Sequence, residues 1–291
     1  MTSISVPSSR PLEPQKLAAL RKVAATASLR GVAPPMLVGA FARDIWFWHV
    51  HGVETERATE DVDISIELPN WQGFRDFVTG LREAGFRQPV PTHPEKLLDE
   101  ETGQKLDVLP FGRLSDDGRA IVWPSDQSRW SILGFAESYQ AAPFLALDAD
   151  LPQGLRIVTL PAMVTLKLVS FYERLVDRKR KDGADISFTM THYLAAGTQT
   201  RLAAGVDADI MDRVEGDLQR AAAMLLGRDM GAILSSVTQS VIAKHLRRET
   251  AGSSECPLAR ELARNGTQGE FQRARVLLQD LLAGLDQELK T

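Results

Sequence analysis

The sequence lacks the features of secreted, membrane-spanning and strongly basic proteins. It contains one cysteine, Cys256, which excludes an internal disulfide and fits a reducing compartment. No apolar run approaches the length of a membrane-spanning helix, and the polar N-terminus lacks a signal-peptide core. The net charge of −4 gives no global attraction to nucleic acid. These absences predict a cytoplasmic protein with no membrane contact.

The composition favours a soluble protein with a large core. The chain has 291 residues, of which 44% are hydrophobic, and this length suggests two domains. Short strands alternate with helices up to about residue 158, and helical periodicity dominates the rest. We therefore predict an α+β fold, with a flexible N-terminus over residues 1–14, a catalytic domain over residues 15–158 and a helical domain over residues 159–291.

The most informative stretch runs from residue 36 to residue 66. Residues 36–38 form an apolar run that predicts a short buried strand, followed by a turn at Gly39-Ala40 and an amphipathic helix. About twenty residues later, Asp61 and Asp63 begin a second predicted strand. Residues i and i+2 of a strand point to the same face, so the two carboxylates lie side by side. Hard oxygen ligands at this spacing suit Mg²⁺.

A third carboxylate, Asp107, lies within another apolar strand over residues 104–112. An unpaired charge is costly at such a place, so this residue is expected to serve a site or a salt bridge. Beside Asp61 and Asp63 it would complete a metal-binding triad. An isolated Asp-x-Asp pair is usually a solvated or capping feature, but the glycine turn and Asp107 favour a site. Backbone N–H groups at the Gly39-Ala40 turn are suited to phosphate, and nucleotidyl transfer needs phosphate binding beside such a metal pair.

These motifs resemble the nucleotidyltransferase superfamily, whose pattern is Gly-Gly or Gly-Ser, then Asp-x-Asp, then a further Asp on a neighbouring strand. The closer resemblance is to bacterial AbiEii/AbiGii-type toxin-like nucleotidyltransferases. It is carried by residues 38–64, 105–112 and 160–193, within roughly half of the chain. One departure is Ala40, which stands where the pattern has a second Gly or a Ser and offers no hydroxyl to a phosphate.

The last of these stretches predicts a helix that starts near Pro161 and carries Lys167 and Arg174 two turns apart beside its apolar stripe. A single lysine at such a place is ordinarily a solvated surface cation. Given the resemblance, we expect both side chains to contact a triphosphate. The basic run at residues 178–181 then precedes Asp182 and Asp185. These two aspartates either serve the active site or cap the next helix at its N-terminus.

The resemblance implies a nucleotidyltransferase fold, in which a small mixed sheet with flanking helices precedes a helical domain that contributes to the active-site cleft. It implies transfer of a nucleoside monophosphate from an NTP to an acceptor hydroxyl, with release of pyrophosphate. Asp61 and Asp63 would hold Mg²⁺ or Mn²⁺, and Asp107 would position a second metal or deprotonate the acceptor. Lys167 would bind phosphate and Asp182 would assist the acceptor. The nucleotide-binding residues would be Gly39, Ala40, Arg43, Lys167 and Arg174.

The toxin-like branch implies an RNA acceptor such as tRNA, a cognate antitoxin and a role in a toxin–antitoxin or phage-defence system. Two other functions stay open. One is a small-molecule nucleotidyltransferase of the antibiotic-modifying kind, which would use the same site with a tight acceptor pocket. The other is a non-catalytic protein of the same fold that binds a nucleotide or a partner. The intact aspartates at positions 61, 63 and 107 argue against such a loss of activity.

Overall fold

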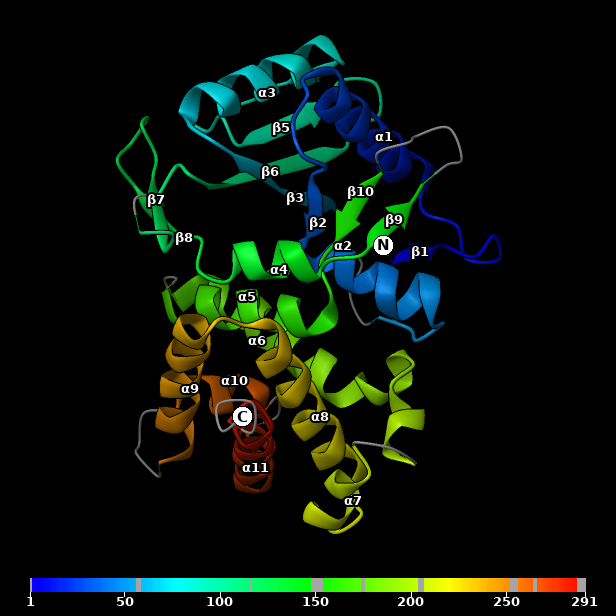
Figure 1. Cartoon of the computed structure of the whole chain (residues 1–291), viewed down its shortest axis with the longest axis vertical. Helices are drawn as coiled ribbons and strands as arrows, with labels where there is room; N and C mark the ends of the chain where they lie inside the picture. The colour runs from blue at the N-terminus through cyan, green and yellow to red at the C-terminus, as the bar shows by residue number, and fades with distance from the viewer. Residues whose placement is uncertain are drawn as a thin grey trace. The chain divides into compact units, whose positions relative to one another are not determined.

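The computed structural model describes residues 2–55, 59–115, 117–147, 154–173, 176–203, 207–251, 256–263 and 266–286. For residues 176–179 the description covers the backbone alone. The chain divides into two compact units, Met1–Thr159 and Leu160–Thr291. Most helices and strands of both units are labelled in Figure 1.

In its described residues, the first unit contains a mixed sheet of eight strands in the order β1-β9-β10-β2-β3-β6-β5-β4. The strands of this sheet are β1 (Ser3–Ser5), β2 (Met36–Val38), β3 (Asp61–Leu68), β4 (Phe86–Arg87), β5 (Lys96–Asp99), β6 (Lys105–Gly112), β9 (Phe144–Ala146) and β10 (Leu155–Ile157). The central strand β3 pairs antiparallel with β2 and parallel with β6. A separate hairpin consists of β7 (Ala120–Val122) and β8 (Arg129–Ser131).

The described part of the first unit contains two long helices and two shorter ones. Helix α1 spans Pro14–Leu29 and α3 spans Trp71–Glu83; the two contact each other, and α3 also contacts β3 (Figure 1). The side chain of Asn70 caps α3 by accepting a hydrogen bond from the Gly73 N–H at 3.0 Å. Two shorter helices are α2 (Gly39–Asp44) and α4 (Phe135–Ala141).

The N-terminal segment departs from its prediction. Where the sequence indicates a loose segment over residues 1–14, strand β1 pairs in parallel with β9 at the edge of the sheet. Arg10 then donates hydrogen bonds to the backbone oxygens of His49 and Val50, each at 3.1 Å. An edge strand is held by backbone hydrogen bonds, so a segment rich in serine and proline can join a sheet without an apolar pattern.

Helix α2 continues directly into a π-helix, η1 (Ile45–Val50), which the sequence does not predict. The His51 N–H donates to the Trp46 oxygen, five residues earlier, at 3.2 Å. The indole N–H of Trp46 donates to the Val158 oxygen at 2.8 Å. These contacts fix the helix that begins at the Gly39 turn to the segment that follows β10.

The described residues of the second unit form helices joined by turns, without a strand. Its elements are α5 (Leu160–Glu173), α6 (Val176–His192), the 3₁₀ segments η2 (Leu194–Ala196) and η3 (Gln199–Leu202), α7 (Asp209–Arg213), α8 (Leu218–Ile233), α9 (Ser236–Thr250), α10 (Pro257–Leu262) and α11 (Gln268–Leu285). Helices α8 and α11 approach closely at two glycines. A Cβ on Gly227 would lie 2.0 Å from the Leu281 oxygen, and one on Gly284 would lie 2.0 Å from the Met224 oxygen.

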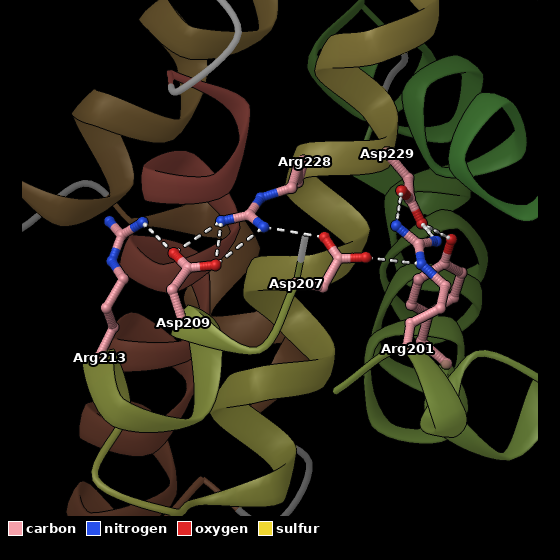
Figure 2. A network of polar contacts seen from close by, with 7 residues as sticks. Arg201, Asp207, Asp209, Arg213, Arg228 and Asp229 are labelled. Atoms are coloured by element: carbon pink, nitrogen blue, oxygen red, sulfur yellow. Dashed lines mark hydrogen bonds and ion pairs between the residues drawn. The ribbon is translucent and has the colours of Figure 1, made fainter. Parts of the chain in front are cut away.

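A network of arginines and aspartates joins η3 and α7 to α8 within the second unit (Figure 2). Arg201 donates to both oxygens of Asp229 at 2.7 and 2.8 Å, and its Nε donates to Asp207 at 2.8 Å. Arg228 donates to the other oxygen of Asp207 at 2.8 Å and to Asp209. Asp207 is buried, so this paired arrangement is needed to offset the cost of burying its charge.

The predicted fold class is confirmed. A mixed sheet with flanking helices occupies the first unit, and a helical region follows it. Among the described residues, no helix has both the length and the apolar character required to cross a membrane.

Candidate functional site

The three aspartates predicted to form a site lie on two neighbouring strands of the first unit. Asp61 and Asp63 are the first and third residues of β3. Asp63 stands opposite Asp107 of β6 in the parallel register, and Asp61 stands opposite Lys105. Paired residues on adjacent strands point to the same face, as do residues i and i+2 of one strand. The fold therefore brings the three carboxylates to one face of the sheet.

Gly39 lies directly against the carboxylate of Asp63. Strand β2 pairs Val38 with Asp63, and the chain then turns at Gly39 with a φ of +73°. A Cβ on Gly39 would lie 2.1 Å from Oδ2 of Asp63. The glycine is thus required twice, for its left-handed conformation and for the close approach. The turn that starts α2 therefore packs directly against the side chain of Asp63.

We expect Gly39→Ala to lower the free energy of unfolding of the first unit by about 2–4 kcal/mol, because backbone strain and overpacking add together. Gly31→Ala is the matched control. Gly31 has a similar φ of +64°, but no atom lies within 4 Å of the position that a Cβ would take, so only the backbone strain of about 1–2 kcal/mol applies. All five tryptophans lie before residue 160, so urea denaturation followed by tryptophan fluorescence reports on this unit. Equal losses in the two variants would contradict the close contact with Asp63.

Asp61 has one carboxylate oxygen that the surrounding protein leaves unsatisfied. Oδ1 of Asp61 is buried and accepts no hydrogen bond from the described residues. The ammonium of Lys105 is 3.8 Å away, and it makes a closer contact of 3.1 Å with Glu60. A buried acceptor without a partner is costly. A cation bound beside Asp61 would remove that cost.

Asp107 is half-buried, and the charges around it oppose one another. Burial raises the pKa of Asp107 above its ordinary value, and the nearby carboxylates of Asp61 and Glu95 raise it further. The ammonium of Lys96, 3.7 Å from Oδ2 of Asp107, opposes this shift. The raised pKa therefore reflects mainly burial, and a carboxyl group with a raised pKa is common in sites that bind cations or transfer protons.

Glu95 is a fourth carboxylate at this place that the sequence analysis misses. Its side chain is buried, and Nδ1 of His93 is 3.1 Å from Oε1 of Glu95. The Glu95 backbone oxygen accepts from the Val108 N–H at 2.8 Å, which holds the residue beside β6. Glu95 precedes its short strand by one residue and belongs to no recognisable motif. Only its proximity to Asp107 singles it out.

The donors of this face suit a magnesium or manganese ion in chemistry, although their side chains do not converge. Carboxylate oxygens are the ligands that such ions prefer. The unsatisfied oxygen of Asp61 suits a metal ion, and the Gly39 turn suits the phosphate of a nucleotide. Within the described residues, however, no group of three or more His, Cys, Asp or Glu side chains is gathered closely enough to hold a metal ion. The metal-binding roles of Asp61, Asp63 and Asp107 stay predictions.

The two other residues predicted on the nucleotide-binding turn are buried in α2. Ala40 contributes to the core. The side chain of Arg43 is 5% exposed, and its guanidinium donates to Oδ1 of Asp44 at 2.6 and 3.0 Å. A direct contact of Arg43 with a nucleotide would require this ion pair to open. The nucleotide-binding role of Arg43 stays a prediction, and in the structure its guanidinium pairs with the carboxylate of the next residue.

Lys167 and Asp182 contact each other within the second unit. The ammonium of Lys167 on α5 is 3.0 Å from Oδ1 of Asp182 and 2.9 Å from Oδ2 of Asp185, both on α6. The Ser170 hydroxyl donates to the other oxygen of Asp182 at 2.8 Å. The carboxylates are only 2% and 1% exposed. Although burial alone would lower the pKa of Lys167, the charges of Asp185 and Asp182 raise it above its ordinary value, so the lysine is charged at neutral pH.

This cluster corrects one interpretation of the two aspartates. Capping of a helix N-terminus is wrong for Asp182 and Asp185, because α6 begins at Val176 and both residues lie in its interior. Their spacing of three residues places them on one side of the helix, facing Lys167. Arg174 lies outside the described residues. In the basic run at residues 178–181, Arg180 and Lys181 are exposed, and the other two side chains lie outside the description.

Comparisons with known proteins add little to this geometry. No protein-family model matches the sequence, and no curated protein is similar to it. Among solved structures, the solution structure of the antibiotic-resistance factor ANT(2'')-Ia aligns over 66% of this chain and 95% of that chain, with a TM-score of 0.37 and 14% sequence identity. A likeness of this size does not establish a shared fold, and we base no function on it.

Proposed function

We propose that this protein is a metal-dependent nucleotidyltransferase that moves a nucleoside monophosphate from an NTP to an acceptor hydroxyl. The observation that supports it is the placement of Asp61, Asp63 and Asp107 on one face of two neighbouring strands, with the Gly39 turn packed against Asp63. Three carboxylates beside a glycine turn provide negative charge for metal ions and backbone N–H groups for phosphate. The sequence motifs that resemble the nucleotidyltransferase superfamily coincide with these positions.

In the proposed reaction, Asp61 and Asp63 would hold Mg²⁺ or Mn²⁺. The metal would supply charge neutralisation at the phosphate oxygens of the NTP. The acceptor oxygen attacks the α-phosphorus, its proton passes to the carboxylate of Asp107, and the bond to the departing pyrophosphate breaks. The raised pKa of Asp107 makes this carboxylate a better proton acceptor than an ordinary aspartate. The Gly39 turn binds phosphate through its backbone.

For the acceptor we propose RNA, with tRNA as the first candidate, and a cognate antitoxin as a partner. The support is the resemblance to the toxin-like branch, together with the basic run in α6, of which Arg180 and Lys181 are exposed. Local positive charge of this kind is needed to bind the phosphates of RNA when the protein as a whole is acidic. On the same resemblance, Lys167, Asp182 and Arg174 are proposed to serve the nucleotide and the acceptor.

The test is incubation of the full-length protein with each of the four α-labelled NTPs and Mg²⁺ or Mn²⁺. Total cellular RNA and a low-molecular-mass cell extract serve as separate acceptors. Label in RNA supports the proposal as stated. Label in the extract alone replaces RNA by a small-molecule acceptor. Calorimetric binding of an NTP without any transfer would indicate a non-catalytic nucleotide-binding protein, and the absence of both binding and transfer would refute the function.

A further inference from the structure

Lys96 lies on the face that carries the three aspartates. Strand β5 pairs antiparallel with β6, and this register places Lys96 opposite Asp107. The ammonium is 3.7 Å from Oδ2 of Asp107, and the two side chains are 41% and 38% exposed. A paired residue on the adjacent strand points to the same face, so Lys96 is a neighbour of the proposed metal and phosphate site.

The contact between Lys96 and Asp107 is loose. Its length exceeds that of a hydrogen bond, so the pair is held by charge across a solvent-accessible gap. The other lysine on this face, Lys105, differs because its ammonium makes a close contact of 3.1 Å with Glu60 besides lying 3.8 Å from Asp61. A lysine ammonium on a flexible stem can change partner at little cost. Lys96 is therefore the cation best placed to leave Asp107.

We propose that Lys96 exchanges its partner when the substrate binds, from the carboxylate of Asp107 to the triphosphate of the NTP. This inference rests on the proposed function and assigns to the site a residue outside its motifs. Before binding, Lys96 offsets the charge of Asp107 and so weakens the attraction of this face for a metal ion beside Asp61 and Asp63. The bound metal takes over this neutralisation, while the triphosphate adds negative charge to the same face. The released ammonium then offsets that charge.

If Lys96 exchanges its partner, the Lys96→Gln variant should bind metal ion more tightly and NTP more weakly than the wild type. In Lys96→Gln, the affinity for Mn²⁺ without nucleotide should rise about two- to fivefold, because a competing cation of an exposed pair is removed. The affinity of the same variant for an Mg²⁺-bound NTP should fall about ten- to a hundredfold, because a charged hydrogen bond to phosphate is lost. Free Mn²⁺ is measured by electron paramagnetic resonance, and NTP binding is measured by calorimetry.

Three further measurements complete the test. Lys96→Arg retains the positive charge and should bind both ligands within about threefold of the wild type. Lys244→Gln removes one exposed charge from α9 and should change neither affinity. Tryptophan fluorescence under urea checks the folding of the Lys96 variants, and far-ultraviolet circular dichroism checks that of Lys244→Gln. If Lys96→Gln changes neither affinity, or moves both in the same direction, the exchange is refuted. A wild-type protein that binds neither Mn²⁺ nor NTP would instead refute the proposed function itself.

Discussion

Replacing Asp63 by asparagine is expected to reduce nucleotidyl transfer about a hundred- to a thousandfold, the range for removing one preorganised electrostatic contact from a reacting site. Asp63 is the central carboxylate of the face: its strand neighbours are Val38 and Asp107, and its side chain lies against Gly39. Asparagine keeps the shape that packs on the glycine and removes the charge. The initial rate of label transfer at saturating NTP measures the effect.

The matched control for this variant is Asp76→Asn, on the exposed side of α3 in the same unit. It should transfer label at the wild-type rate. Tryptophan fluorescence under urea should give Asp63→Asn a stability within about 0.5 kcal/mol of the wild type, or above it, because removing one of several like charges relieves repulsion. A transfer rate within threefold of the wild type would show that Asp63 holds no metal in the reaction.

Replacing Lys167 by methionine is expected to lower the free energy of unfolding of the second unit by about 3–5 kcal/mol. Methionine has a similar length, but it leaves Asp182 and Asp185 buried without the cation that both contact. The hydrogen bond from Ser170 offsets only part of that cost. Urea denaturation followed by far-ultraviolet circular dichroism measures the change, because the described part of this unit is helical.

Two further variants separate the ion cluster from a general effect of substitution. Lys244→Met, on the exposed side of α9, should change the stability by no more than about 0.5 kcal/mol. Adding Asp182→Asn and Asp185→Asn to Lys167→Met should restore most of the loss, because no uncompensated buried charge then remains. A small effect of Lys167→Met would mean that the cluster does not stabilise the unit, which would leave the lysine available for phosphate binding.

The elements that carry the aspartates could be predicted from the sequence because each is defined by its own residues. The apolar run before Gly39, the strand that begins at Asp61 and the strand around Asp107 all occur as expected. Helix α5 follows from its apolar stripe and from Pro161 near its first residue. These patterns lie within single short segments, and each segment forms the same strand or helix in the folded protein.

Features that join distant segments could not be predicted in the same way. Glu95 and Lys96 reach Asp107 only through the pairing of β5 with β6, and no motif surrounds them. The contact of Lys167 with Asp185 requires α5 and α6 to pack against each other, whereas the sequence offered helix capping for that aspartate. The partner of a buried charge depends on which helix or strand packs beside it.

The sequence by itself determined the α+β class, the strands and helix that carry the predicted site residues, and the residue types able to bind a metal and phosphates. These properties arise from local periodicity and from the chemistry of single side chains. The tertiary structure decided that Asp63 and Asp107 stand opposite each other, that Gly39 is packed against Asp63, and that Lys96 shares their face. Strand register decides such neighbours, because it is fixed by the cooperative packing of the whole sheet and by no single segment.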